Sequence, residues 1–464
     1  MRPTARLARR RGRAWPGGVL LLALLTFTGS SPPSAVARPP QGTTGHSGCT
    51  VLYAADEGGA YGGNNEDERN PLTWIWFVPG EDGAYGSAFV GYDDLVVQGG
   101  MNEEGLFFDA LGVREVEVPG RPGKPESTGQ SFVADVMGRC DSVDCVLERL
   151  DAISMPGTWN GQYLFGDRFG SSAIIEPLTV IRGTGRFQVA TNFFQSEVPV
   201  ADRRDERYLA ATRLLDEATA FSVDEVRSVL EATRQNGTVN TVYSTIYELG
   251  ARVVHLHYFG DFDHERTFDV RSELARSVHG YEIAQLFPPN EGADQVAAPI
   301  RARVAAVLAA DATAGETDPA ALEMLTGTYE IAPGIPLFIE SEGGVLRARQ
   351  PLTPWVDLAP ASATEFVRVS SDGEGIVHEQ LLRFQLAEGR ATRIEITVDG
   401  GTSMVAVRSE ASSPGLPLAA VAAGLLAAAL AGAVALTRAR RRHDSDSPDR
   451  ARSSSRPSVA RGHE

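Results

Sequence analysis

SGCTVLYAADEGGAYGGNNED, residues 47–67, places one cysteine directly before a short apolar run, a glycine-rich turn and a group of amides and acids. This cysteine, Cys49, is one of only three in 464 residues, the others being Cys140 and Cys145. Outside the cytoplasm Cys140 and Cys145 are close enough in sequence to pair as a local disulfide, with two unpaired cysteines in a helix as the alternative. If they pair, Cys49 is left as a reactive thiol at the start of a strand.

The two ends of the chain carry targeting signals. Residues 1–37 combine an arginine-rich start, an apolar run and the sequence Ala-Val-Ala, which together are typical of a secretory signal peptide. The uncharged segment 416–436 has about the length that a bilayer core requires, and arginines follow it at once. We therefore expect a single-pass protein of the cell membrane, extracytoplasmic between these segments, with residues 437–464 as a disordered cytoplasmic tail.

The exported part of the chain is strongly acidic. Removing the +6 of the signal segment and the +4 of the tail from the total of −17 leaves −27 on the residues between them. A nucleic-acid partner requires a basic stripe that neutralises phosphates. The charge therefore excludes nucleic acid as the expected partner. The partners that remain to be expected are a small-molecule substrate, the membrane and further copies of this chain.

Between its ends the sequence divides into two domains of different texture. Up to about residue 287, β-rich runs alternate with glycine turns, and helices are predicted at capping boxes that begin at Ser142 and Ser222 and at residues 207–217. Residues 291–322 are alanine-rich and predict a helical linker. The short, evenly spaced strands that follow are typical of a small antiparallel barrel or sandwich. We expect an α+β domain at 49–290 and a small β-domain at 323–410.

Cys49 is the best candidate nucleophile. The sequence offers no convincing metal motif, serine-hydrolase elbow or phosphate loop, and His255 and His257 are interpreted as structural or solvent-facing, so that neither a metal nor a cofactor is expected. A thiol reacts as its thiolate and needs a base or positive charge nearby. Cleavage between Gly48 and Cys49 would free an α-amino group with a pKa of about 8, which could itself serve as the base.

The same stretch resembles the opening of the choloylglycine hydrolase and penicillin V acylase family of N-terminal-nucleophile hydrolases, whose members begin with Cys-Thr and reach a Tyr-x-Gly-Arg-Asn-x-Asp turn. Three later segments are similar to family segments in the same order: GGMNEEGLFFDALG at 99–112, FGDRFGSSAIIE at 165–176 and VATNFF at 189–194. The resemblance covers about residues 49–270. It implies a four-layer αββα sandwich and an enzyme that cleaves linear amide bonds.

Residue by residue, the resemblance implies four members of a catalytic site. Cys49 matches the nucleophile, and Asp67 matches the acid that holds the α-amino group in place. Asn192 matches the side-chain donor of the oxyanion hole. Arg207 is the best match to the arginine that steadies the nucleophile region.

Two positions depart from the family pattern. The turn arginine of the family is Asn64 here, and the substrate-loop asparagine of the bile-acid enzymes falls on Gly112, which offers only a backbone N–H. The first departure points away from a bile-salt substrate, and the second leaves the oxyanion hole dependent on a main-chain donor together with Asn192. A general hydrolase of a small N-acyl amide, or an acyltransferase, is compatible with both. A surface-anchored binding protein that has kept the scaffold and lost turnover is the competing hypothesis.

Residues 38–48 are interpreted as a pro-segment. A signal peptidase that cuts after Ala37 leaves this segment ahead of Cys49, and an amine held in a peptide bond cannot act as a base. Lipid modification of Cys49 is excluded, because His46 stands where an apolar residue is required. We therefore expect that autolysis or another protease removes the segment.

Overall fold

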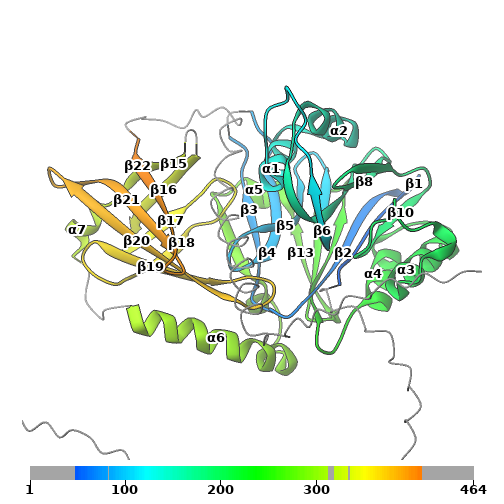
Figure 1. Cartoon of the computed structure of the whole chain (residues 1–464). Coiled ribbons are helices and arrows are strands. Elements are labelled where there is room, and N and C mark those ends of the chain that lie inside the picture. The colour runs from blue at the N-terminus through cyan, green and yellow to red at the C-terminus, as the bar shows by residue number, and fades with distance from the viewer. Residues whose placement is uncertain (1–47, 82, 312–317, 333–334, 410–464) are drawn as a thin grey trace, which may run out of the picture. The chain divides into compact units, whose positions relative to one another are not determined.

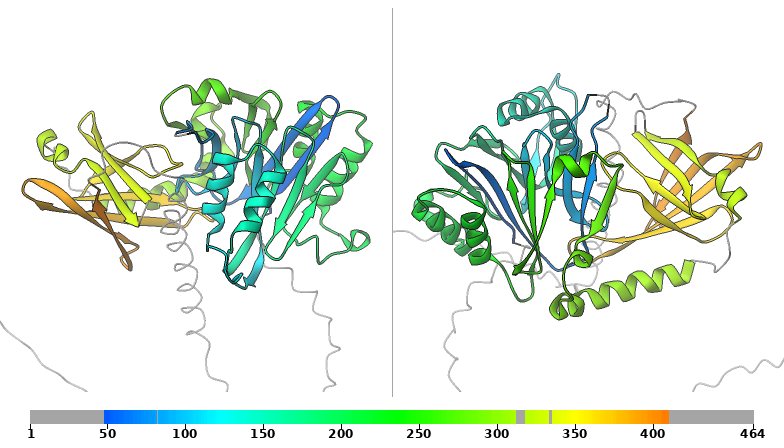
Figure 2. Two further views of the ribbon diagram at one scale, coloured as in Figure 1. Left: turned by 90° about the horizontal axis from the view of Figure 1, so that it is seen from above. Right: turned by 180° about the vertical axis from the view of Figure 1, so that it is seen from behind.

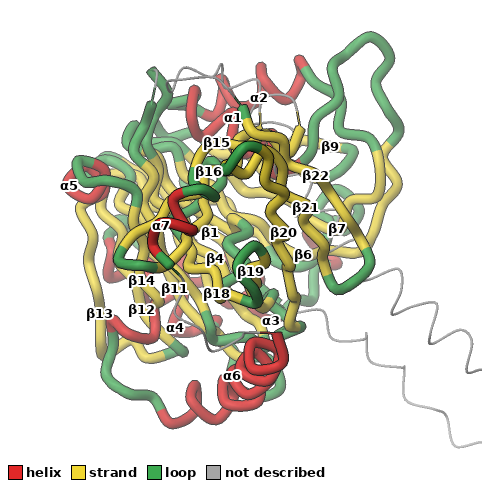
Figure 3. Tube along the Cα trace, turned by 90° about the vertical axis from the view of Figure 1, so that its left-hand side faces the viewer, coloured by secondary structure: helices red, strands yellow, loops and turns green. Residues whose placement is uncertain are grey.

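The computed structural model describes residues 48–81, 83–311, 318–332 and 335–409 (Figure 1). The predicted signal peptide, residues 38–47 of the predicted pro-segment, the predicted membrane helix at 416–436 and the predicted tail lie outside these ranges. Within the described ranges, no helix combines the length and the apolar character that a membrane crossing requires. In the described ranges more residues lie in strands than in helices or in loops (Figure 3).

The region that follows Cys49 contains two antiparallel sheets. The first has the strand order β10 (Phe187–Ala190), β1 (Thr50–Asp56), β2 (Gly59–Glu68), β11 (Asn240–Glu248), β12 (Val253–Tyr258) and β13 (Asp261–Asp269). The second has the order β14 (His279–Glu282), β3 (Thr73–Val78), β4 (Ser87–Tyr92), β5 (Val97–Asn102), β6 (Phe107–Val118), β7 (Gly157–Gly166), β8 (Ser172–Glu176) and β9 (Thr179–Arg182).

Helices cover the outer faces of both sheets. They are α1 (Gly129–Arg139) and α2 (Val143–Ala152) on the second sheet, and α3 (Glu206–Glu217) and α4 (Val223–Thr233) on the first; the short helices are α5 (Val270–Leu274), η1 (Val200–Asp202) and η2 (Ile283–Leu286). Figure 2 shows α1 and α2 (cyan) and α3 and α4 (green) outside two facing sheets. The α+β class predicted from the sequence is confirmed.

The alternation of side chains along each strand produces these layers. Val51 of β1 and Phe77 of β3 point into one core that lies between the two sheets. Their neighbours Leu52 and Trp76 point outward, and Leu52 packs against the α3 and α4 side while Trp76 packs against the α1 and α2 side. Cys49 belongs to the inner core. The start of β1 therefore places the candidate nucleophile between the sheets.

The segment after residue 290 is helical and then forms a barrel. Helices α6 (Glu291–Asp311) and α7 (Pro319–Glu323) fall in the predicted linker. The barrel strands are β15 (Gly327–Ala332), β16 (Ile335–Glu342), β17 (Val345–Arg349), β18 (Val356–Pro360), β19 (Glu365–Ser371), β20 (Val377–Ala387), β21 (Arg390–Val398) and β22 (Thr402–Arg408). The pairing of Tyr329 with Arg408 closes the barrel, so the barrel alternative holds over the sandwich. The domain boundaries themselves stay predictions.

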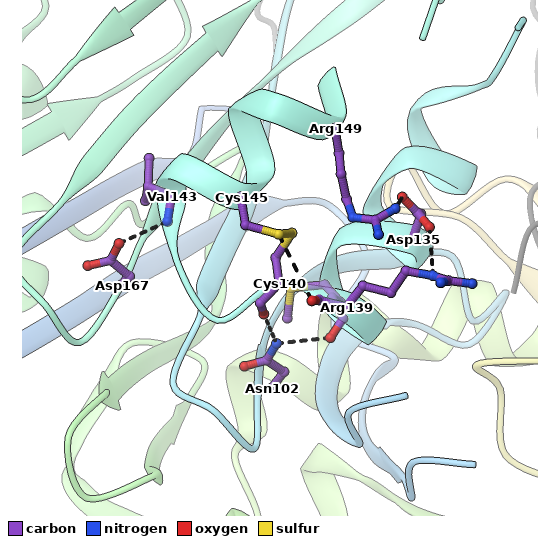
Figure 4. Close-up of a disulfide and its surroundings, with 9 residues drawn as sticks. Asn102, Asp135, Arg139, Cys140, Val143, Cys145, Arg149 and Asp167 are labelled. Carbon is purple, nitrogen blue, oxygen red and sulfur yellow. Dashed lines mark hydrogen bonds and ion pairs between the residues drawn. A yellow bond between two sulfur atoms is a disulfide. The ribbon is translucent and has the colours of Figure 1, made fainter. Parts of the chain in front are cut away.

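The predicted pairing of Cys140 with Cys145 is present as a disulfide across the turn between α1 and α2 (Figure 4). The side-chain amide of Asn102, at the end of β5, donates to the carbonyl oxygens of Met137 and Cys140 at 2.9 and 2.8 Å. These contacts satisfy carbonyls at the end of α1 that lack helical partners. The turn is thereby attached to the second sheet.

One of the two predicted capping boxes is wrong. Ser222 accepts from the backbone N–H of Glu225, as predicted for α4. Ser142 precedes α2 but its side chain makes no capping hydrogen bond. Instead the backbone N–H of Val143 donates to the carboxylate of Asp167 at 2.8 Å (Figure 4). A carboxylate from the loop after β7 supplies the cap, which no local pattern could indicate.

Candidate active site

Cys49 lies directly before β1, and its side chain is buried, with 5% of the residue exposed. It is the free cysteine of the chain, because the other two are joined. Strand β1 pairs with β2 so that Thr50 lies opposite Asn65. This register brings Cys49 to the end of β2 that carries Glu66 and Asp67.

Asp67 is fully buried beside the nucleophile. One carboxylate oxygen accepts from the hydroxyl of Thr241, while the other, Oδ2, has no hydrogen-bond partner in the described part of the chain. The nearest cation is Arg207, whose Nη1 lies 3.7 Å from Oδ2. Burial raises the pKa of Asp67 well above its ordinary value, against the hydroxyl of Thr241 and the charge of Arg207, which lower it.

Arg207 connects the nucleophile to α3. Its Nη1 donates to the carbonyl oxygen of Cys49 at 2.7 Å, and Nη1 and Nη2 donate to Oδ1 of Asn192 at 3.1 and 3.2 Å. Asp205 fixes this arginine twice, because it caps α3 through the N–H of Tyr208 and pairs with Nη2 at 3.0 Å. The guanidinium is therefore held in place by the start of its own helix.

The residue ahead of the nucleophile lies against the same guanidinium. A Cβ added to Gly48 would stand 2.9 Å from Nη1 of Arg207, closer than two such atoms normally approach. Glycine is therefore the residue that fits at this position without displacing Arg207. The guanidinium of Arg207 therefore lies next to the Gly48–Cys49 peptide bond, whose cleavage would free the α-amino group of Cys49.

The two positions assigned to the oxyanion region are brought together. Nδ2 of Asn192 donates to the carbonyl oxygen of Gly112 at 2.8 Å, although 80 residues separate them. No heavy atom lies within 4 Å of a Cβ built on Gly112, among those described, so the space beside it is open. Gly112 contributes its carbonyl oxygen to this contact, whereas the sequence led us to expect its backbone N–H to act as a donor in the oxyanion hole. Asn192 keeps a second amide hydrogen that this contact does not use.

Asn64, which stands where the resemblance places an arginine, is also buried in the site. Its Nδ2 donates to Oε2 of Glu66 at 3.3 Å. A neutral amide therefore takes the expected position of a cation, and its hydrogen-bond partner is a carboxylate. The site near the thiol is poorer in positive charge as a result.

Sequence reasoning missed two carboxyl groups. Glu66 is 4% exposed and hydrogen-bonds the hydroxyl of Tyr92 at 2.6 Å, and its carboxylate also contacts the Cys49 thiol. Asp109 on β6 is fully buried. Glu66 shares the inward face of β2 with Gly62, which packs on Phe107 in the inner core, but the polar residues around Glu66 conceal this alternation in the sequence. The signal for Asp109 was an acid within an apolar run.

The site is electronegative. Burial raises the pKa of the Cys49 thiol well above its ordinary value, and the charges of Glu66 and Asp67 raise it further. The backbone N–H of Asp67 acts in the opposite direction by donating to the sulfur. In the chain that still carries Gly48, the thiol is therefore protonated at neutral pH, and attack would require a base or a positive charge to be added.

The histidines considered for metal binding lie elsewhere. Nδ1 of His255 lies 3.1 Å from Glu265, and His257 is buried with its Nδ1 at 2.9 Å from the carbonyl oxygen of His264. In the described ranges no group of three or more His, Cys, Asp or Glu side chains is arranged to hold a metal ion.

Solved structures match about half of the chain at low sequence identity. A penicillin V acylase from Agrobacterium tumefaciens aligns with a TM-score of 0.38 and 17% identity, over 45% of this chain and 82% of the acylase. Two variants of the conjugated bile acid hydrolase from Clostridium perfringens each align with a TM-score of 0.42 and 16% identity, over 52% of this chain and 99% of the hydrolase. No protein-family model and no curated protein matches the sequence.

Proposed function

We propose that the protein is an amide hydrolase that uses Cys49 as an N-terminal nucleophile on a linear N-acyl amide. The observation that carries this proposal is the buried Oδ2 of Asp67, which lacks a hydrogen-bond donor while Arg207 connects the same carboxylate to the Cys49 backbone. A buried carboxylate oxygen without a donor is costly. The α-amino group that cleavage after Gly48 creates would supply the missing donor.

The chemistry proceeds in two steps. The α-amine takes the thiol proton, the sulfur attacks the substrate carbonyl, and the tetrahedral intermediate collapses to a thioester as the C–N bond breaks and the leaving amine takes that proton. Water then attacks the thioester, the carboxylic acid leaves, and the sulfur regains a proton. If a second amine replaces water, the same site performs acyl transfer.

The surrounding residues have separate roles in this proposal. Asp67 holds the α-amino group, and Arg207 holds the Cys49 backbone and the Oδ1 of Asn192. With its carbonyl end fixed by Arg207 and one amide hydrogen donated to Gly112, Asn192 would offer its remaining amide hydrogen to the developing oxyanion. Residues 416–436 are proposed to anchor the protein in the membrane, with the site outside the cytoplasm.

A catalytically impaired binding protein is the second candidate, and one observation favours it. The Cys49 thiol is buried against two carboxyl groups, which disfavours the thiolate. An active enzyme must overcome this cost after processing, whereas a binding protein need not.

The deciding experiment combines the N-terminus with turnover. The exported protein is analysed by mass spectrometry, and its hydrolysis of N-acyl amino acids, penicillins and conjugated bile acids is measured beside a Cys49→Ser variant. We expect a chain that begins at Cys49, turnover of at least one of these amides, and none by the variant. Full turnover by a chain that retains residues 38–48 would contradict the N-terminal mechanism.

A further inference from the structure

Two buried carboxyl groups, one of which contacts the nucleophile, have no role in the mechanism proposed above. Glu66 on β2 and Asp109 on β6 come from different sheets, and both side chains lie in the core between the sheets. We call them the acidic pair. Their charges act on each other, since Glu66 raises the pKa of Asp109, in the same direction as burial.

Asp109 lacks the partners that a buried carboxylate normally has. Neither of its oxygens forms a hydrogen bond with another side chain in the described ranges, and only the backbone N–H of Ala110 acts against the burial of its charge. Its Oδ2 lies over Gly99 of the neighbouring strand, where an added Cβ would stand 2.1 Å away. The fold therefore provides space for this carboxylate but no side-chain hydrogen-bond donor to its oxygens in the described ranges.

Glu66 is the member of the acidic pair that lies next to the proposed nucleophile. Glu66 accepts from Tyr92 at 2.6 Å and from Asn64 at 3.3 Å, and it reaches the Cys49 thiol. In the described ranges no ion pair joins either member of the acidic pair to a Lys, Arg or His side chain. The nearby guanidinium of Arg207 is engaged by Cys49, Asp67, Asn192 and Asp205.

Buried charge without a counter-ion is expensive, so the acidic pair must either hold protons or receive a cation. Three tyrosines lie beside it. The hydroxyl of Tyr92 donates to Glu66, and the charges of both carboxyl groups act on the buried phenol groups of Tyr243 and Tyr247. Carboxylates and aromatic side chains are groups that bind organic cations in proteins.

We propose that the acidic pair binds a cationic group of the substrate, an ammonium or guanidinium close to the scissile carbonyl. This inference rests on the proposed hydrolase function and names its substrate class as N-acyl amides that carry a basic group. Because Glu66 touches the thiol, a cation bound there also neutralises the charge that opposes the thiolate. A basic substrate thus assists activation of Cys49, and a neutral amide does not.

The test measures the charge preference of Cys49 labelling in the full chain. Three methanethiosulfonates are used: aminoethyl, which is cationic, methyl, which is neutral, and sulfonatoethyl, which is anionic. Each forms a mixed disulfide with the thiolate and releases methanesulfinate. Cys49 is the free thiol, so the labelled position is unambiguous. The ratio of two rates cancels the thiolate fraction, so a change in thiol pKa alone leaves the ratio unchanged.

We expect the ratio of cationic to anionic labelling rates to be about tenfold or more above that of Glu66→Gln and Asp109→Asn. Asp216→Asn, on the exposed face of α3, removes one carboxylate from the surface and should keep the original ratio. An equal ratio in the original chain and in both acidic-pair variants overturns the inference. Should a variant not fold, protection of the original Cys49 from the neutral reagent by 2-aminohexanamide, whose ammonium adjoins the carbonyl, is compared with protection by hexanamide. Equal protection by the two amides overturns the inference.

Failure of this inference and failure of the hydrolase proposal give different results. Labelling requires no turnover, so a cation preference in a chain that hydrolyses no amide retains the cation site and rejects the hydrolase. Turnover of neutral and basic amides with equal kcat/KM, together with equal labelling ratios, rejects the cation site and retains the hydrolase.

Discussion

The guanidinium of Arg207 donates to the carbonyl oxygen of Cys49 at 2.7 Å, across 158 residues of sequence. This contact joins the start of α3 to the start of β1, the two elements between which the candidate site is built. Because Arg207 binds the carbonyl group of Cys49, the backbone nitrogen of Cys49 remains available to interact with Asp67 in the proposed mechanism. The relationship thus separates the group that holds the nucleophile in place from the group that would hold its base.

Asn192→Ala should slow turnover without changing the thiol. The variant removes one hydrogen bond to the developing oxyanion, so we expect kcat to fall by about 10²–10³, as for other oxyanion-hole donors. Rapid iodoacetamide labelling of Cys49 should persist. Cys49→Ser is the matched control, which should lose both labelling and turnover. An unchanged kcat in Asn192→Ala would remove Asn192 from the oxyanion assignment.

Glu66→Gln should move the pH dependence of Cys49 labelling to lower pH. The charge of Glu66 raises the pKa of the thiol, so its removal lowers that pKa and forms the thiolate earlier. We expect half-maximal iodoacetamide labelling to be reached at a lower pH than in the original chain. Asp216→Asn should not shift the curve. A shift to higher pH would show that the Glu66 contact favours the thiolate.

Asp109→Asn should flatten the dependence of stability on pH. Burial raises the pKa of Asp109 well above that of an unfolded aspartate, which is about 3.9. Above that pH the unfolded chain has lost a proton that the folded chain keeps, so the free energy of unfolding falls as pH rises. The variant does not lose stability in this way, so its Tm should rise relative to that of the original chain as pH increases above about 4. Parallel Tm curves would contradict the burial of an unsatisfied carboxyl.

His378→Gln should act on the barrel in the alkaline range. Hydrogen bonds to Asp372 and Asp399, at 3.3 and 3.0 Å, raise the pKa of His378 to about 9. The raised pKa contributes stability that is complete below the unfolded value of about 6.5 and is lost as pH rises through the folded value. The variant should be less stable by about 1 kcal/mol at pH 6 and comparable at pH 10, as measured by urea unfolding. An equal deficit at both pH values would indicate lost packing.

The local patterns of the sequence predicted the elements well. The run 207–217 and the Ser222 capping box gave α3 and α4 nearly to the residue, since caps and helical periodicity are local properties. Helix α1 was missed, although Thr128 caps it through Ser131 and its buried residues Phe132, Val133, Val136 and Met137 recur at helical spacing. The cap that Asp167 supplies to α2 is a tertiary contact and could not be predicted.

The candidate site was predictable only in part. Asp67, Asn192 and Arg207 came from the resemblance, and the structure places all of them in one chain of contacts that starts at Cys49. Their roles stay predictions. Glu66 stands in a group of acids and amides. These adjacent polar residues hide the alternation by which the side chain of Glu66 faces inward while that of Asn65 faces α4.

The close approach of Asp109 to Gly99 has a consequence for evolution. The carboxylate occupies the volume that any side chain at position 99 would require. In relatives of this protein the two positions should therefore covary: an alanine or larger residue in place of Gly99 should occur only with a shorter residue in place of Asp109. A lineage that loses the glycine would lose the acid as well, and its preference among substrates should change in the same step.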